Sequence, residues 1–119
     1  MVKQITVLGS TGSIGVSTLD VIARHPERFH VFALAAQRSV ELIFKQCLQF
    51  QPRYAVLVDE SAAEQLSKQL RTAGSATEVL QGTAALAQVA EHGDVDYVIT
   101  KRMWNSDFEK VGTTKTDET

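Results

Sequence analysis

Apolar residues occur in two patterns that alternate along this chain. Short, nearly unbroken runs of β-branched and aliphatic residues are separated by longer stretches in which apolar residues recur every three or four positions. Continuous runs of this length are typical of strands buried on both faces, and the longer spacing is typical of amphipathic helices. The runs predict five strands, at residues 4–8, 29–36, 54–58, 78–80 and 95–99.

The stretches between these runs predict four helices, each bounded by residues that start or stop helices. The boundary pairs are Ser13 and Pro26, Ser39 and Pro52, Ser61 (in a capping box with Glu64) and Gly74, and Thr83 and Gly93. The residues expected to face the core are Ile14, Leu19, Ile22 and Ala23, then Val40, Ile43, Phe44, Cys47 and Leu48, then Leu66 and Leu70, and finally Leu86, Val89 and Ala90.

Strands that alternate with helices at this rhythm require right-handed crossovers and a parallel sheet covered on both faces. The predicted fold class is therefore α/β, a doubly wound, Rossmann-type sheet of five parallel strands with helices on both faces. Such sheets bind ligands outside the carboxyl ends of the strands, where the strand order reverses. We expect that reversal between the first and fourth strands.

The turn after the first strand carries glycines where a phosphate-binding loop needs them. Gly9 can make the tight turn, Gly12 lets a pyrophosphate approach the backbone, and Gly15 lets the next helix pack closely on the sheet. The free N–H groups of the first helical turn would then face the anion. The expected contacts with a dinucleotide are Gly9, Ser10, Thr11, Gly12, Ser13, Ile14 and Gly15, with hydroxyl donors from Thr11 and Ser13.

The spacing of these glycines does not identify the ligand by itself. It is Gly-x-x-Gly-x-x-Gly rather than the better-known Gly-x-Gly-x-x-Gly, so a purely structural strand-to-helix turn is the alternative interpretation. A Walker-type loop needs a lysine after its second glycine, and the sequence has none between Lys3 and Lys45. The position between a strand and a helix favours the dinucleotide.

The end of the second predicted strand indicates which dinucleotide. Binders of the unphosphorylated cofactor usually carry a carboxylate there, but residues 35–39 read Ala-Ala-Gln-Arg-Ser. Arg38 offers a guanidinium whose N–H groups fit a phosphate, and Ser39 can add a hydroxyl and a backbone N–H. We therefore expect NADPH rather than NADH, with a solvated surface arginine as the alternative.

Composition narrows the remaining possibilities. A chain of 119 residues that is 44% hydrophobic is typical of one globular domain. The net charge of −2 argues against nucleic acid and anionic membranes as partners. No apolar run approaches about 18 residues and no secretory signal pattern begins the chain, so we expect a cytoplasmic protein.

The titratable residues predict neither a catalytic centre nor a metal site. The three histidines, His25, His30 and His92, lack the spacing of metal ligands. Asp94 and Asp96 lie at the start of the fifth strand, away from the expected cleft, and Cys47 lies on an apolar helical stripe as a buried structural thiol. No nucleophile is paired with a base, so the residues predict binding only.

Residues 101–119 differ in character from the rest. They are polar, and their large apolar residues are scattered: Met103, Trp104, Phe108 and Val111. We expect a nucleotide-binding domain at residues 1–100 and a divergent, partly disordered tail at 101–119. A short helix at residues 103–108 is the alternative for part of that tail.

Several segments, in order, resemble the N-terminal part of the 1-deoxy-D-xylulose 5-phosphate reductoisomerase family. They are residues 8–15 (Leu-Gly-Ser-Thr-Gly-Ser-Ile-Gly), 17–22 (Ser-Thr-Leu-Asp-Val-Ile), 25–29 (His-Pro-Glu-Arg-Phe), 33–36 (Ala-Leu-Ala-Ala), Gln46-Cys47 with Phe50-Gln51-Pro52, and 77–80 (Thr-Glu-Val-Leu). The resemblance extends from Val2 to about Val98. Other nucleotide-binding families, including semialdehyde dehydrogenases, have similar glycine turns without this succession.

The resemblance implies an NADPH-dependent, homodimeric enzyme that uses Mg²⁺ or Mn²⁺. Such enzymes rearrange 1-deoxy-D-xylulose 5-phosphate and reduce the aldehyde intermediate to 2-C-methyl-D-erythritol 4-phosphate, in the methylerythritol phosphate route to isoprenoids. By position, Thr11, Gly12, Ser13 and Ile14 match the family's pyrophosphate turn. Gln37, Arg38 and Ser39 match its 2′-phosphate loop, although the family usually has glycine in place of Gln37.

After Val98 the chain departs from the family. The family continues with small apolar residues, an Asn-Lys-Glu motif and acidic metal ligands, whereas here residues 101–105 read Lys-Arg-Met-Trp-Asn. We therefore expect a cofactor-binding piece that is inactive alone and can self-associate through an uncovered sheet edge. The alternatives are a free-standing nucleotide-binding or regulatory module, and a folded remnant that binds no cofactor.

Overall fold

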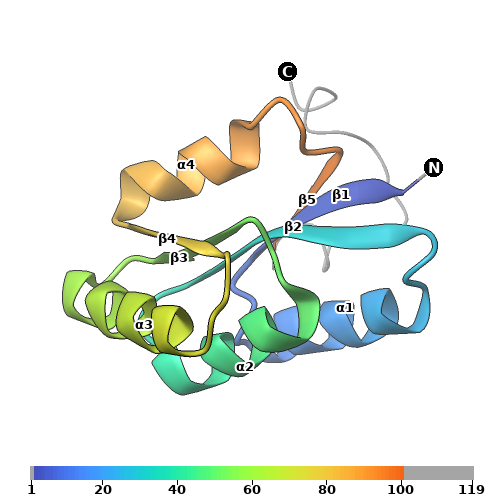
Figure 1. Cartoon of the computed structure of the whole chain (residues 1–119). Coiled ribbons are helices and arrows are strands. Elements are labelled where there is room, and N and C mark those ends of the chain that lie inside the picture. Colours follow the sequence, from blue (N-terminus) through green and yellow to red (C-terminus); the bar gives the residue numbers. More distant parts are fainter. Residues whose placement is uncertain (1, 101–119) are drawn as a thin grey trace.

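Strands and helices alternate along residues 2–100, the part of the chain that this computed structural model describes (Figure 1). The elements are β1 (Lys3–Leu8), α1 (Ser13–Arg24), β2 (Phe29–Ala36), α2 (Val40–Phe50), β3 (Tyr54–Leu57), α3 (Glu60–Thr72), β4 (Glu78–Gln81), α4 (Thr83–Glu91) and β5 (Tyr97–Ile99). The predicted α/β class is confirmed. The predicted tail at residues 101–119, with its alternative short helix, lies outside the described residues.

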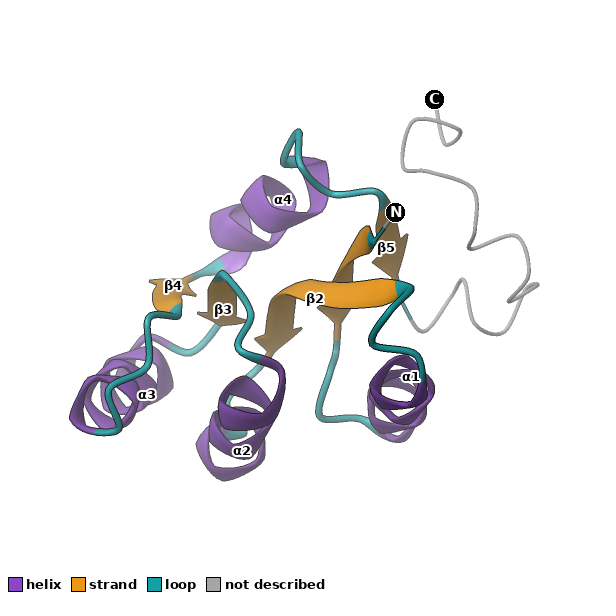
Figure 2. Ribbon diagram, turned by 45° about the vertical axis from the view of Figure 1, so that its right-hand side comes forward, coloured by secondary structure: helices purple, strands orange, loops and turns teal. Residues whose placement is uncertain are grey.

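The five strands form one parallel sheet in the order β4-β3-β2-β1-β5. Figure 2 shows α1, α2 and α3 on one face of the sheet and α4 on the other. Three successive crossovers step in one direction, from β1 to β4, before the chain returns past β1 to form β5. The strand order therefore reverses between β1 and β5, and our expectation of a reversal between the first and fourth strands was wrong. Hydrophobic periodicity carries no information about the order of strands.

Each face of the sheet has its own apolar layer. Ile5, Leu34 and Ile43 belong to the layer under α1, α2 and α3, whereas Val56 and Val89 belong to the layer under α4. These side chains are at most 3% exposed. Burial of this kind is the main favourable contribution to folding.

A bulge in β2 adds a large ring to the α4 side. Ile5 pairs with Val31 and the next residue, Thr6, pairs with Ala33, so Phe32 is the extra residue. Phe32 and Ala33 consequently both belong to the layer under α4. The bulge places the Phe32 ring beside Tyr54 and His92, with ring centroids 5.7 and 4.8 Å away.

Several predicted details of the helices were wrong. Ala23 and Leu48 were expected to face the core, but both are exposed because they lie at the edges of their apolar stripes. Helix α3 begins at Glu60 rather than at a Ser61 capping box. The Asp59 carboxylate caps it by accepting a hydrogen bond from the Ala62 N–H at 2.9 Å.

Candidate functional site

The turn between β1 and α1 is fixed by the neighbouring strand. The N–H groups of Gly9 and Ser10 both donate to the Ala35 carbonyl oxygen of β2, at 2.7 and 2.9 Å. Gly9 has a φ of 80°, a conformation that glycine adopts without strain, and its carbonyl oxygen accepts from the Gly12 N–H at 3.1 Å. The turn is therefore held at the carboxyl ends of β1 and β2.

Packing requires glycine at only one of two positions in this turn, Gly12 and Gly15. A Cβ on Gly15 would lie 2.2 Å from the Gly9 carbonyl oxygen and 2.6 Å from the Ser10 Cα, so α1 can start this close only with glycine at position 15. A Cβ on Gly12 would meet only the Gly9 oxygen, at an ordinary 3.6 Å. The fold requires glycine at position 15, and the packing leaves position 12 open.

The first turn of α1 presents backbone donors that the fold leaves open. The N–H groups of Ser13, Ile14 and Gly15 have no acceptor within residues 2–100, and Val16 is the first to bond within the helix, to the Gly12 carbonyl oxygen at 2.9 Å. The positive end of the helix dipole lies at these donors. Together they form a site suited to an anion such as a phosphate.

A cavity of about 220 Å³ borders these donors. Its lining residues come from β1, the turn, the first turn of α1 and β5: Val7, Leu8, Gly9, Gly12, Ser13, Ile14, Gly15 and Ile99. Ile99 closes β5, so the cavity lies where the strand order reverses. Doubly wound sheets bind their ligands at this place.

Ser10 has its hydroxyl turned away from solvent. The residue is fully buried, its Oγ donates to the Gln46 Oε1 at 2.8 Å, and the Gln46 Nε2 donates to the Ser10 carbonyl oxygen at 2.9 Å. Ser10 therefore holds the turn in place. We did not single out Gln46 as a site residue from the sequence, although a signal exists: Gln46 is a polar residue in phase with Ile43 and Phe50 on the inner face of α2.

A second loop, residues 37–39, lies at the same edge of the sheet between β2 and α2. Its three residues, Gln37, Arg38 and Ser39, are exposed. The backbone carbonyls of Gln37 and Arg38 accept from the N–H groups of Asp59 and Val40 at 3.0 and 2.9 Å. Ser39 occupies the N-cap position of α2, but its side chain makes no capping hydrogen bond. The Arg38 guanidinium forms no ion pair within residues 2–100.

The structure brings the two loops close together. Gly9 and Ser10 bond to Ala35, which lies in β2, two residues before the loop residue Gln37. The sequence-predicted pyrophosphate turn and 2′-phosphate loop thus follow adjacent parallel strands. A ligand with two separated phosphate groups could contact both.

The acidic residues Asp94 and Asp96 lie at the opposite edge and have structural partners. The Asp94 carboxylate accepts from the Arg53 guanidinium at 3.2 Å, and the Asp96 carboxylate accepts from the Gln4 N–H at 2.7 Å. Within residues 2–100, no group of three or more histidine, cysteine, aspartate or glutamate side chains could hold a metal ion. The described residues therefore do not fit a divalent-cation centre.

Cys47 is buried, as its helical stripe predicts. The side chain is inaccessible to solvent, and burial raises the pKa of its thiol to about 12. A thiol in this state is a poor nucleophile because the reactive form is the thiolate.

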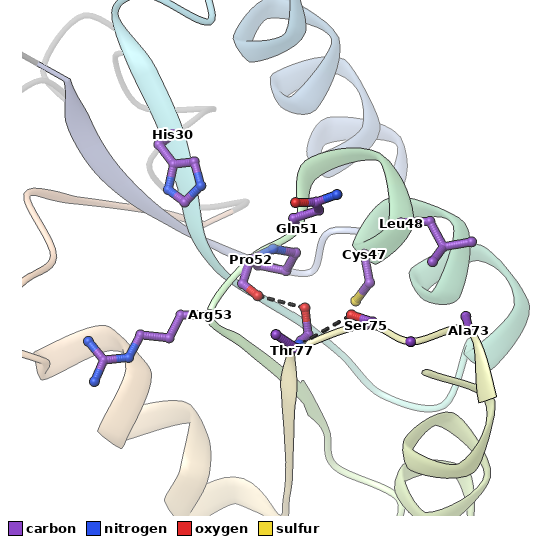
Figure 3. Close-up of a pocket in the computed structure, with 11 residues that line it drawn as sticks. His30, Cys47, Leu48, Gln51, Pro52, Arg53, Ala73, Ser75 and Thr77 are labelled. Atoms are coloured by element: carbon purple, nitrogen blue, oxygen red, sulfur yellow. Dashed lines mark hydrogen bonds between the residues drawn. The ribbon is translucent and has the colours of Figure 1, made fainter. Parts of the chain in front are cut away.

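A larger cavity of about 470 Å³ lies at the amino edge of the sheet (Figure 3). It is lined by His30, Cys47, Leu48, Gln51, Pro52, Arg53 and residues 73–77. Several of its polar groups already have partners: the Thr77 hydroxyl donates to the Pro52 carbonyl oxygen at 2.6 Å, and the Thr77 N–H donates to the Ser75 Oγ at 3.2 Å. Size alone therefore does not make this cavity the better candidate.

No helix within residues 2–100 is long and apolar enough to cross a bilayer.

Comparison with known proteins gives one consistent family. Residues 5–103 match the family model for 1-deoxy-D-xylulose 5-phosphate reductoisomerase. Relatives of that name from Aromatoleum aromaticum and Nitrosospira multiformis are 61% and 60% identical over 97 and 98 residues. Each alignment covers 82% of this chain but only 24% and 25% of the relative.

Solved structures agree with this family. A DOX-P reductoisomerase in complex with NADPH, fosmidomycin and magnesium superposes with a TM-score of 0.78 at 33% identity. The reductoisomerase from Zymomonas mobilis in complex with NADPH superposes with a TM-score of 0.76 at 39% identity. Each match covers 82% of this chain and 24% or 25% of the solved chain, so the chain spans about a quarter of the length of these relatives.

Proposed function

This chain belongs to the 1-deoxy-D-xylulose 5-phosphate reductoisomerase family, and from that premise we propose that its residues 1–100 form an NADPH-binding domain. The complete enzyme of which this domain is part would rearrange and reduce 1-deoxy-D-xylulose 5-phosphate to 2-C-methyl-D-erythritol 4-phosphate. The observation that carries the proposal is the row of open N–H groups at Ser13, Ile14 and Gly15, beside the exposed loop that holds Arg38.

The turn would hold the pyrophosphate. Open N–H groups at a helix N-terminus bind anions through hydrogen bonds and the helix dipole, and the Thr11 and Ser13 hydroxyls would add donors. The protein's own packing does not require glycine at position 12. A glycine there is consistent with close approach of a ligand to the backbone. Gly9, Ser10 and Gly15 would shape the turn, since their contacts are made within the protein.

The loop at residues 37–39 would select the phosphorylated cofactor. Arg38 can donate two parallel hydrogen bonds to a 2′-phosphate, and Ser39 can add its hydroxyl. Gln37 stands where the family usually has glycine, and its carbonyl is already bonded to Asp59. When bound, the nicotinamide of NADPH supplies the hydride for reduction.

Titration of NADPH and NADH with the purified chain tests this assignment. We expect NADPH to raise Tm, because a ligand that binds only the folded state stabilises it. Arg38→Ala should weaken NADPH binding at least tenfold and leave NADH nearly unchanged, since a charge-assisted hydrogen bond contributes about 1.5–3 kcal/mol. Arg71→Ala, which removes an exposed arginine in the last turn of α3, is the matched control.

Three outcomes would count against the proposal. Equal affinity for the two cofactors, or unchanged selectivity in Arg38→Ala, would reject the role of the loop. Absence of any NADPH-dependent rise in Tm would favour the folded remnant that binds no cofactor. Turnover of the sugar phosphate by this 119-residue chain alone would overturn our expectation that it is inactive by itself.

The remaining features implied by the family belong to the same proposal. They are Mg²⁺ or Mn²⁺ in the complete enzyme, a homodimeric assembly and a cytoplasmic location. Within residues 2–100, β5 pairs only with β1, and an open strand edge favours pairing with another chain. Light scattering that shows a concentration-independent monomer would reject self-association through this edge.

A further inference from the structure

We propose that Gln46 is a positioning residue that sets the pyrophosphate turn in register with the loop at residues 37–39. The inference rests on the proposed NADPH-binding function. It is carried by the paired hydrogen bonds between Ser10 and Gln46, which link two residues that are 36 positions apart in the sequence.

The two hydrogen bonds use both ends of one side-chain amide. The Gln46 Oε1 accepts from the Ser10 hydroxyl at 2.8 Å, and its Nε2 donates to the Ser10 carbonyl oxygen at 2.9 Å. Ser10 is 0% exposed and Gln46 is 7% exposed, so water cannot readily replace either partner. Leaving a buried polar group unpaired is costly, and the pair therefore favours one conformation of the turn.

Ser10 is the point at which three elements meet. The Ala35 carbonyl oxygen of β2 accepts from its N–H, Gln46 of α2 binds its hydroxyl and carbonyl, and Gly15 of α1 packs against its Cα. The open donors begin at Ser13, three residues later. A shift of Ser10 would therefore move the donors that face the pyrophosphate.

Helix α2 connects this point to the second loop. Arg38 and Ser39 immediately precede the helix, and Gln46 lies seven residues after Ser39, about two helical turns further on. The amide of Gln46 thus ties the element that carries the 2′-phosphate loop to the pyrophosphate turn. A ligand that spans both loops depends on this distance, whereas a ligand that contacts only one loop does not.

Gln46→Met provides the main test, because methionine has a similar length, cannot donate to the Ser10 carbonyl oxygen, and offers the Ser10 hydroxyl only a weak sulfur acceptor. We expect NADPH to bind about tenfold more weakly to this variant, and NADH, which has no 2′-phosphate for the second loop, to be weakened less, as isothermal titration would show. Adenosine 2′-phosphate carries the 2′-phosphate without a pyrophosphate, and it should bind as well as it does to the unmodified chain. A merely structural role for Gln46 would not separate these ligands.

The control is Gln49→Met, on an exposed position of the same helix, which should leave all three affinities unchanged. If Gln46→Met is folded and binds NADPH within twofold of the unmodified chain, or if it loses adenosine 2′-phosphate equally, the inference is overturned.

A second variant covers the case in which Gln46→Met does not fold. Ser10→Ala removes only the hydroxyl and leaves the bond from Nε2 to the carbonyl oxygen. We expect about threefold weaker NADPH binding with unchanged adenosine 2′-phosphate binding, and unaltered NADPH binding would overturn the inference. An unmodified chain that binds no NADPH would instead reject the proposed function itself, and the inference with it.

Discussion

The two edges of the sheet are both hollowed, but they differ in the state of their polar groups. At the carboxyl edge the cavity is about 220 Å³, and it borders the open N–H groups of Ser13, Ile14 and Gly15. At the amino edge the cavity is about 470 Å³, yet Thr77 in its lining is already bonded to Pro52 and Ser75 (Figure 3). Open donors, rather than volume, therefore distinguish the edge to which we assign the cofactor.

The arginines at the two edges also differ in whether they have a partner. Arg38 at the carboxyl edge has no ion-pair partner within residues 2–100, whereas Arg53 at the amino edge pairs with Asp94 at 3.2 Å. The Arg53 guanidinium also lies over the rings of Phe32 and Tyr54, 5.8 and 5.4 Å from their centroids. One arginine remains available to a ligand, and the other is used within the fold.

The largest effect on stability and binding should come from adding a single methyl group at position 15, where α1 packs against the turn. In Gly15→Ala, the new Cβ would lie 2.2 Å from the Gly9 carbonyl oxygen, so α1 or the turn must shift. We expect a net loss of about 2 kcal/mol in the free energy of unfolding, because overpacking exceeds the helix propensity gained with alanine. NADPH affinity should fall more than tenfold, as measured by titration of the folded variant.

Gly93→Ala is the matched control for this substitution. A Cβ on Gly93 would have no atom within 4 Å, so neither stability nor binding should change appreciably. A folded Gly15→Ala variant with unaltered NADPH affinity would show that close packing of α1 against the turn does not position the donors.

Local patterns predicted much of this architecture because the relevant signals are local. The bounds of β2 agree with the predicted residues 29–36, and α4 begins at the predicted Thr83 and ends before the predicted stop at Gly93. The open donors of α1 were also foreseeable, because glycines after a buried strand determine how the chain must turn. These features depend on neighbours in the sequence.

Features that depend on distant contacts could not be predicted in this way. The position of β5 beside β1 follows from how the crossovers stack, which helical or strand periodicity does not encode. We expected a capping box at Ser61 to start α3, but Asp59, whose N–H bonds to the distant Gln37 carbonyl oxygen, caps the helix instead. The periodicity of α2 places Gln46 on the buried face, but its partner Ser10, 36 positions away, is identified only by the structure.

A smaller effect, on stability alone, should come from the amino edge. In Arg53→Ala, an exposed ion pair and the contacts with two aromatic rings are lost together. We expect the free energy of unfolding to fall by about 1.5 kcal/mol, since each kind of contact contributes roughly 0.2–1 kcal/mol. Denaturant unfolding would measure this change, while the NADPH affinity should stay within twofold of the unmodified chain.

Asp94→Asn separates the contributions at this edge, because it removes the ion pair and leaves the guanidinium over the rings. We expect Asp94→Asn to lower the free energy of unfolding by less than half as much as Arg53→Ala does. Weakened NADPH binding in either variant would contradict the assignment of the two edges to different roles.

The smallest effect concerns Cys47, which lines the amino-edge cavity without being exposed to it. Burial raises the pKa of its thiol from 9.0 to about 12, so the folded state holds its proton more tightly than the unfolded state. This contribution to stability is fully present below about pH 9 and is lost as the pH rises from 9 towards 12. By pH 9.5 it should be reduced by roughly 1 kcal/mol relative to pH 7.5.

Cys47→Ala isolates this loss from the other groups that titrate at high pH. The cavity left by alanine lowers stability equally at each pH, so only the difference between the two unfolding curves reports on the thiol. We expect that difference to narrow between pH 7.5 and 9.5. If the difference in unfolding free energy between the two proteins stays constant with pH, and the native thiol is labelled rapidly, then the larger cavity opens to solvent at Cys47. The amino edge would then carry a reactive thiol. It could no longer be described as an edge that contributes to stability alone, in contrast to the carboxyl edge that binds the cofactor.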